Sequence, residues 1–155
     1  MNKHIRKHGR MAGITMVESL VALVVISVGM LGIAGLYLAS LQAGRSANLR
    51  MQAINLATDM ADHIRANKRG RQFYKAGPTD KGTFVDCVKN TCTPEDVAKN
   101  DIFVWKKAIS EALPANANGQ LTFTEAGTPD NVAVLVVWRE PGADIDSTYK
   151  AMVEL

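Results

Sequence analysis

The chain has 155 residues, 47% of them hydrophobic, and a formal net charge of +3. That length suits one domain with an appendage. Loss of residues 1–13 would remove four of the 18 lysine and arginine residues and leave 14 of them against 15 acids, a net charge of −1. The basic character of the chain therefore belongs to its N-terminal segment. The net charge of the whole chain is for this reason no argument for nucleic-acid binding.

The first 41 residues join a basic tract to an apolar one. Residues 20–41 carry no charge, a run long enough to cross a bilayer core, which takes roughly 20 helical residues. No acid precedes Gly13, and four cations do: Lys3, Arg6, Lys7 and Arg10. A secretory signal is cut after its apolar core, whereas here the expected cut lies before it, between Gly13 and Ile14. The apolar helix would stay on the mature protein, and the positive-inside rule places everything after Leu41 across the membrane.

A single carboxylate, Glu18, lies at the start of the apolar run. A carboxylate inside a bilayer costs on the order of 3 kcal/mol and therefore needs a partner. Cleavage after Gly13 would create an ammonium group on Ile14. Glu18 reaches that group more easily on a neighbouring copy at the same depth than on its own straight helix. We therefore predict pairing between subunits; the alternative is a solvated carboxylate at the level of the lipid headgroups.

Residues 13–18, with the sequence GITMVE, resemble the class III signal of type IV prepilins and of type II secretion pseudopilins. The resemblance implies cleavage after Gly13 by a membrane prepilin peptidase and methylation of the new N-terminus at Ile14. It also implies that Glu18 pairs with the N-terminal amine of an adjacent pilin and sets the axial register. The family usually has phenylalanine at the first mature position, where this chain has Ile14.

Three glycines follow in the apolar run at intervals of three: Gly29, Gly32 and Gly35. Glycine lowers helix stability by up to roughly 1 kcal/mol relative to alanine in water, whereas small residues let two membrane helices approach closely. Close packing and local unwinding are both open as roles for these glycines, beside the ordinary use of glycine in membrane helices.

From Gln42 the composition becomes more polar, and the helix is expected to continue to residue 69. An apolar stripe follows the pattern of an amphipathic helix: Leu49, Ala53, Leu56, Ala57, Met60 and Ile64. Gly70 is predicted to be the C′ residue that ends this helix. The helix would thus have a transmembrane half, residues 14–41, and an amphipathic periplasmic half, residues 42–69. His63 is expected on its surface or in an interface.

The chain has two cysteines, Cys87 and Cys92, in a loop-rich stretch between residues 71 and 100. An even pair at close spacing in an exported protein indicates a disulfide. A metal site would need further ligands nearby, and redox catalysis favours a C-x-x-C spacing. We therefore predict a disulfide and neither of the other two.

A second helix is expected from residue 93 to residue 113. Thr93 is the predicted N-cap, because proline and two acids follow it in the first turn. Trp105 falls on the apolar side of this helix and is predicted in the core. An interruption at Asn100 and Asp101, which would give two short helices, remains open.

Three strands are predicted after Pro114, at residues 120–125, 132–138 and 148–155. The first and third alternate between apolar and polar residues, whereas the second is apolar on both faces, as in a central strand. They are expected to form an antiparallel sheet whose apolar face buries the stripe of the N-terminal helix. The predicted fold is therefore α+β, in the pattern of type IV pilins, with residues 70–155 as the head.

Neither a catalytic nor a metal site is predicted. The chain lacks the G-x-S-x-G, H-E-x-x-H, P-loop and Rossmann glycine patterns, so we expect no enzyme and no cofactor. Asp144 and Asp146 indicate a turn, since two carboxylates are too few for calcium, which takes roughly six to eight oxygen ligands. His4 and His8 are four residues apart in the removable tract, where no metal-binding role is expected.

Features along the rest of the chain resemble a minor pilin of type IV pili: RANKRG at residues 65–70, the cysteine pair, DIFVW at residues 101–105 and ALP at residues 112–114. The resemblance implies a priming or tip complex with other minor pilins and the major pilin, built by an inner-membrane assembly platform in a Gram-negative bacterium and associated with a tip adhesin. Two further classes stay open. One is a minor pseudopilin of type II secretion, and the other is a bitopic membrane anchor with a periplasmic binding head.

Overall fold

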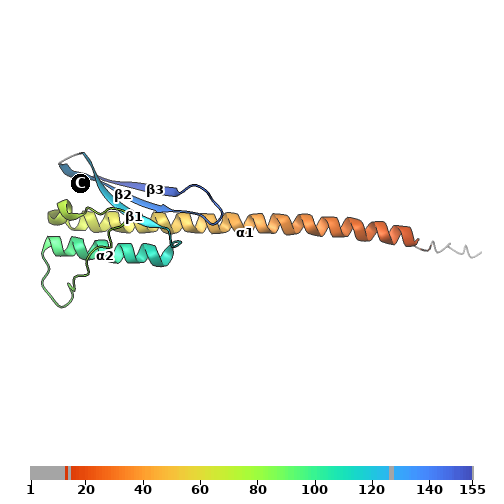
Figure 1. Ribbon diagram of the computed structural model, residues 1–155, viewed down its shortest axis with the longest axis horizontal. Helices are drawn as coiled ribbons and strands as arrows, with labels where there is room; N and C mark the ends of the chain where they lie inside the picture. Colours follow the sequence, from red (N-terminus) through yellow and green to blue (C-terminus); the bar gives the residue numbers. More distant parts are fainter. Residues whose placement is uncertain (1–12, 14, 126–127, 155) are drawn as a thin grey trace, which may run out of the picture. The chain divides into compact units, whose positions relative to one another are not determined.

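The computed structural model describes Gly13, residues 15–125 and residues 128–154 of the chain (Figure 1). The chain divides into two compact units, Met1–Ala43 and Gly44–Leu155. Its elements in chain order are α1 (Met16–Ala66), the 3-10 helix η1 (Lys68–Phe73), α2 (Pro94–Ala112), β1 (Asn118–Glu125), β2 (Thr128–Trp138) and β3 (Ser147–Glu154). A long N-terminal helix with a small antiparallel sheet is the predicted α+β arrangement, which is therefore confirmed.

The sheet has the strand order β1-β2-β3, and both strand pairs are antiparallel. β2 is the central strand, as its apolar sequence predicted. The strands β1 and β2 begin earlier than expected, because the pairing reaches Asn118 opposite Val137 and Thr128 opposite Glu125. Beyond β1, the Ala76 amide and carbonyl both bond to the backbone of Leu121, so part of this edge of the sheet is covered.

The core of the second unit lies between the sheet and the C-terminal half of α1. The predicted stripe of α1 is confirmed, with four members fully buried and two packed against the core: Ala53, Ala57, Met60 and Ile64, then Leu49 and Leu56. The sheet contributes alternate residues of its central strand: Val132, Val134, Val136 and Trp138. In Figure 1 this half of α1 is drawn between the sheet and α2, and α2 also packs directly against the start of β1, where a Cβ at Gly119 would collide with Trp105 and Ile109.

The end of α1 differs from the prediction. The helix stops at Ala66, and η1 follows with Asn67 as its N-cap, whose side-chain oxygen accepts a hydrogen bond from the Gly70 amide at 3.1 Å. Gly70 lies inside η1, and it is not among the described residues with positive φ, which are Gly82 and Gly142. The prediction of Gly70 as a C′ cap was therefore wrong. Glycine is needed there for space, since a Cβ would collide with the Asn67 side chain and the Pro94 carbonyl.

α2 is one continuous helix, without an interruption at Asn100 and Asp101. Both side chains bond outside the helix. Asn100 Oδ1 accepts a hydrogen bond from the Val85 amide at 3.2 Å, and Asp101 Oδ2 accepts one from the Tyr74 hydroxyl at 2.5 Å. Because they are engaged in this way, these side chains do not compete for the hydrogen bonds of their own helix.

The start of α2 is fixed by a reciprocal cap, which confirms Thr93 as the N-cap. Thr93 Oγ1 accepts a hydrogen bond from the Asp96 amide at 3.2 Å, and Asp96 Oδ2 accepts one from the Thr93 amide at 3.1 Å. The Thr93 hydroxyl, and next its backbone amide, hold the pKa of Asp96 below its usual value. The carboxylate therefore stays ionised at the helix N-terminus, where a negative charge is favourable.

Three sequence predictions concern residues outside the described part of the chain. They are the basic tract at residues 1–12, the new N-terminus at Ile14, and Leu155 at the end of the third predicted strand.

Candidate functional site

The first unit presents an apolar helix surface. From Met16 to Leu41, sixteen large apolar side chains are between 49% and 93% exposed. By length and composition α1 can cross a membrane, and its apolar window is not buried within the chain. Apolar surface left in water costs about 25 cal/mol per Å². This surface therefore calls for lipid or other helices around it.

Glu18 is the one charged residue between Gly13 and Gly44. α1 begins directly after Thr15, whose Oγ1 accepts a hydrogen bond from the Glu18 amide at 3.3 Å, so Thr15 caps the helix. The Glu18 carboxylate itself has no hydrogen-bond or ion-pair partner among the described residues. A carboxylate in lipid needs such a partner, and no described residue of the same chain supplies it.

The three glycines of the apolar run have open space around them. A Cβ at Gly29, Gly32 or Gly35 would meet no heavy atom within 4 Å. No contact with the described part of the chain therefore requires glycine at these positions, where it lowers helix propensity by up to roughly 1 kcal/mol each. Close packing against another helix and local unwinding both stay predictions.

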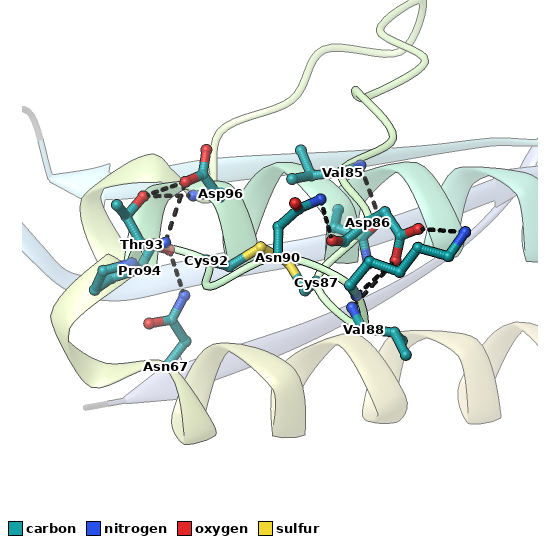
Figure 2. The surroundings of a disulfide bond; sticks show 12 residues. Asn67, Val85, Asp86, Cys87, Val88, Asn90, Cys92, Thr93, Pro94 and Asp96 are labelled. Atoms are coloured by element: carbon teal, nitrogen blue, oxygen red, sulfur yellow. Dashed lines mark hydrogen bonds and ion pairs between the residues drawn. A yellow bond between two sulfur atoms is a disulfide. The ribbon is translucent and has the colours of Figure 1, made fainter.

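Cys87 and Cys92 form the predicted disulfide, with their Cα atoms 5.4 Å apart (Figure 2). The loop that it closes is shaped by Asp86, whose Oδ1 accepts hydrogen bonds from the amides of Val88 and Lys89, both at 3.2 Å. Just beyond the second cysteine, the Pro94 carbonyl accepts a hydrogen bond from Asn67 Nδ2 at 2.7 Å. The disulfide thus closes a short loop just before α2, and the hydrogen bond between Asn67 and Pro94 holds the start of α2 near the end of α1.

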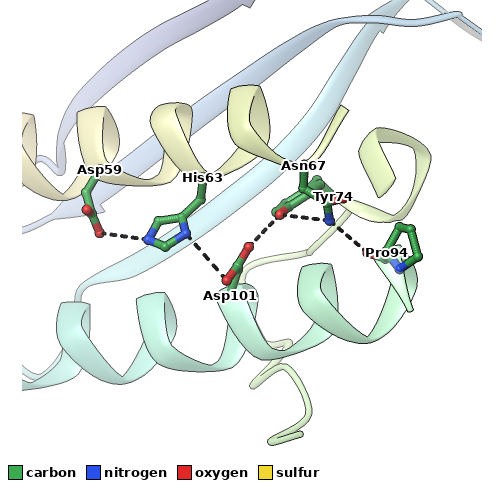
Figure 3. A network of polar contacts seen from close by, with 6 residues as sticks. All are labelled: Asp59, His63, Asn67, Tyr74, Pro94 and Asp101. Atoms are coloured by element: carbon green, nitrogen blue, oxygen red, sulfur yellow. Dashed lines mark hydrogen bonds and ion pairs between the residues drawn. The ribbon is translucent and has the colours of Figure 1, made fainter. Parts of the chain in front are cut away.

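A polar network that we did not predict connects the end of α1 with the residue after η1 and with α2 (Figure 3). Tyr74 is fully buried, and its hydroxyl bonds to Asp101, whose Oδ1 lies 3.4 Å from His63 Nδ1. On its other side, His63 Nε2 lies 3.8 Å from Asp59 Oδ2. His63 was expected on the surface or in an interface; its side chain is 48% exposed and meets α2 of its own chain.

Alkaline pH should weaken this network. Burial, and next the hydrogen bond to the Asp101 carboxylate, raise the pKa of Tyr74 above its ordinary value. A phenol with a raised pKa in the folded state stabilises the fold below its ordinary pKa of about 10, and the stabilisation is lost as the pH rises through the folded value. We therefore expect the free energy of unfolding to fall as the pH rises above about 10, and to fall less steeply in Tyr74→Phe. Urea unfolding of the full chain across this range measures both slopes, and equal slopes would contradict the prediction.

The other predicted residues do not gather into a second site. Asp146 Oδ1 accepts a hydrogen bond from Arg139 Nε at 2.7 Å within the loop between β2 and β3, and Asp144 is exposed. Within Gly13, residues 15–125 and residues 128–154, no group of three or more His, Cys, Asp or Glu residues could hold a metal ion. The candidate functional site is therefore the helix surface of residues 16–43 with Glu18 at its start.

Comparison with known families supports a pilin role. Residues 35–103 match the model of the family Tt1218-like, described as Type IV pilin Tt1218. The matched range holds the end of the apolar run, the rest of α1, η1, the disulfide and the first half of α2, and it begins after Glu18. The chain is thus similar to type IV pilins, a structural and not an enzymatic family, both in this range and in its fold. Neither the curated proteins nor the solved structures gave a match.

Proposed function

We propose that the chain is a minor pilin of a type IV pilus, of the kind called PilV. In this proposal a peptidase cuts between Gly13 and Ile14, and Ile14 is methylated. The helix then anchors the chain in the inner membrane until assembly. In the fibre, the chain joins other minor pilins in a priming or tip complex that initiates assembly for twitching motility and adhesion. The match over residues 35–103 and the long helix with its small sheet support the pilin role.

The observation that carries the proposal is that the carboxylate of Glu18 meets no partner within residues 15–125 and 128–154, on a helix surface that is otherwise apolar and exposed. A plain membrane anchor gains nothing from this residue, because an apolar replacement would insert at lower cost. Pairing with an ammonium group explains the carboxylate, because a neighbouring subunit at the same depth would bring such a group within reach of Glu18. Cleavage before Ile14 would supply that ammonium group on each subunit.

The residues that resemble PilV have identified roles in the head, which supports this narrower proposal. In the RANKRG segment, Asn67 caps η1 and Gly70 leaves room for the Asn67 side chain. In the DIFVW segment, Trp105 is 3% exposed and donates its Nε1 hydrogen to the Leu56 carbonyl at 2.9 Å. Through the Asn67–Pro94 and Trp105–Leu56 hydrogen bonds, both segments thus contribute to the packing of α2 beside the C-terminal half of α1.

Deletion of the gene in its host, followed by complementation with the full chain, tests the function. We expect loss of surface pili and of twitching, both restored by the wild-type chain. Loss of enzyme secretion with normal pili would instead indicate a type II secretion pseudopilin. No change in either would contradict both assembly roles and leave the membrane-anchor class.

A further inference from the structure

The second unit carries an open, mostly apolar pocket of about 360 Å³ beside α2. Its walls come from the loop before α2, from α2 and from the start of β1, and they include Pro78, Lys81, Phe103, Lys107, Ser110 and Ala117. Lys106 also lines the pocket, but its Nζ is engaged with the carbonyls of Gly77 at 2.6 Å and Gly119 at 2.5 Å. These bonds join α2 to the loop before it and to β1, so the walls of the pocket are held together within one chain.

Two lysines, Lys81 and Lys107, give the pocket a positive charge that nearby carboxylates neutralise only weakly. Lys81 is exposed and takes part in no ion pair among the described residues. Lys107 is 63% exposed and lies 3.8 Å from Glu111, and exposed pairs of this kind contribute little. The one carboxylate that lines the pocket, Asp80, accepts a hydrogen bond from the Gly77 amide at 2.6 Å. The pocket therefore fits an apolar side chain that has carboxylates beside it.

The same chain exposes such a side chain. Ile145, in the loop between β2 and β3, is 81% exposed and stands between Asp144 and Asp146. The loop is held by the bond of Asp146 to Arg139 and by a hydrogen bond from the Ala143 amide to the Glu140 carbonyl at 3.0 Å. An apolar side chain on a braced loop loses little conformational freedom when it inserts into a partner.

We propose that Ile145 of one copy of this chain inserts into the α2 pocket of a second copy, where Asp144 faces Lys81 and Lys107. Ile145 does not fill the pocket of its own chain, because its side chain is 81% exposed and does not line that pocket. The contact joins two different patches, so it is heterologous and can continue from copy to copy. It lies between heads and is independent of Glu18.

Cross-linking of full-length chains in intact membranes tests the contact. One tagged copy carries Ile145→Cys, a second copy with a different tag carries Ser110→Cys in the pocket, and a short bismaleimide joins cysteines that meet. The control partner carries Asn55→Cys, an exposed position on α1 outside the pocket. We expect the pair at positions 145 and 110 to cross-link at least tenfold more than the pair at positions 145 and 55. Equal yields, no cross-link, or a cross-link from position 145 to a different protein alone would overturn the proposal.

A charge exchange gives a second readout that a general loss of folding would not reproduce. Lys81→Glu in the pocket copy should lower the cross-linking yield roughly fivefold, by repulsion of Asp144. Asp144→Lys in the other copy should then restore the yield. Neither Lys81 nor Asp144 forms an ion pair among the described residues, so both variants should fold. Failure of the second change to restore the first would contradict the proposed orientation.

Discussion

Glu18→Ala should leave cleavage after Gly13 intact and stop incorporation of the chain into the fibre. The carboxylate costs on the order of 3 kcal/mol in lipid, so the variant should enter the membrane at least as readily as the wild type. It lacks only the group that we propose to pair with the N-terminal ammonium of a neighbour. In the wild type, pairing in the fibre would offset this cost of about 3 kcal/mol and so favour incorporation; the alanine variant lacks that gain. Since 1.4 kcal/mol corresponds to a factor of ten, its incorporation should be roughly a hundredfold lower. Immunoblots of sheared fibres and of membranes measure the two populations.

Two further variants make this experiment specific. Glu154→Ala removes an exposed carboxylate from β3 and should leave incorporation unchanged. Glu18→Asp keeps the charge on a shorter side chain and should give an intermediate level. Normal incorporation of Glu18→Ala would show that pairing at this depth is not required.

The second large effect is expected at Trp105, which joins α2 to α1. The side chain is 3% exposed, and its Nε1 donates a hydrogen bond to the Leu56 carbonyl at 2.9 Å. Trp105→Ala should lower the free energy of unfolding of the head by about 3 to 5 kcal/mol, because it leaves a large cavity in the core. Urea unfolding of the full chain in detergent measures this change, with the fluorescence of the buried Trp138 as the signal.

Trp105→Phe separates packing from hydrogen bonding. It keeps an aromatic ring and loses the N–H donor, so it should lower the free energy of unfolding less than the alanine variant does. The expected loss is about 1 kcal/mol for the hydrogen bond, plus the packing lost with the smaller ring. Val104→Ala, at a neighbouring side chain that is 52% exposed, should change the free energy of unfolding by no more than about 0.5 kcal/mol. A loss at Val104 as large as that at Trp105 would contradict the assignment of Trp105 to the core.

The features predicted correctly from the sequence depend on periodic patterns and local chemistry. The stripe from Leu49 to Ile64 has helical spacing, and its members are buried or packed against the core. Thr93 with Pro94 and two acids marks the start of α2 because capping depends on neighbours in the sequence. The disulfide was predictable from the close spacing of its two cysteines in a chain that we expect to be exported.

Two of the errors and omissions involve contacts between residues distant in the sequence, and one is local. Gly70 has the local context of a helix C-terminus, but the Asn67 side chain and the distant Pro94 carbonyl leave no room for a Cβ there. Tyr74 and Asp101 are 27 residues apart, and no periodicity connects them. The Thr15 cap could have been found, since Thr15 and Glu18 have the spacing of a capping box.

The N-terminus of the chain isolated from membranes tests the central claim most directly, namely that Glu18 has an ammonium partner on another subunit. Mass spectrometry should find Ile14 as the first residue, with a methylated amino group. An intact chain that still begins at Met1 would have no ammonium group at the depth of Glu18, and that result would contradict assembly through this site.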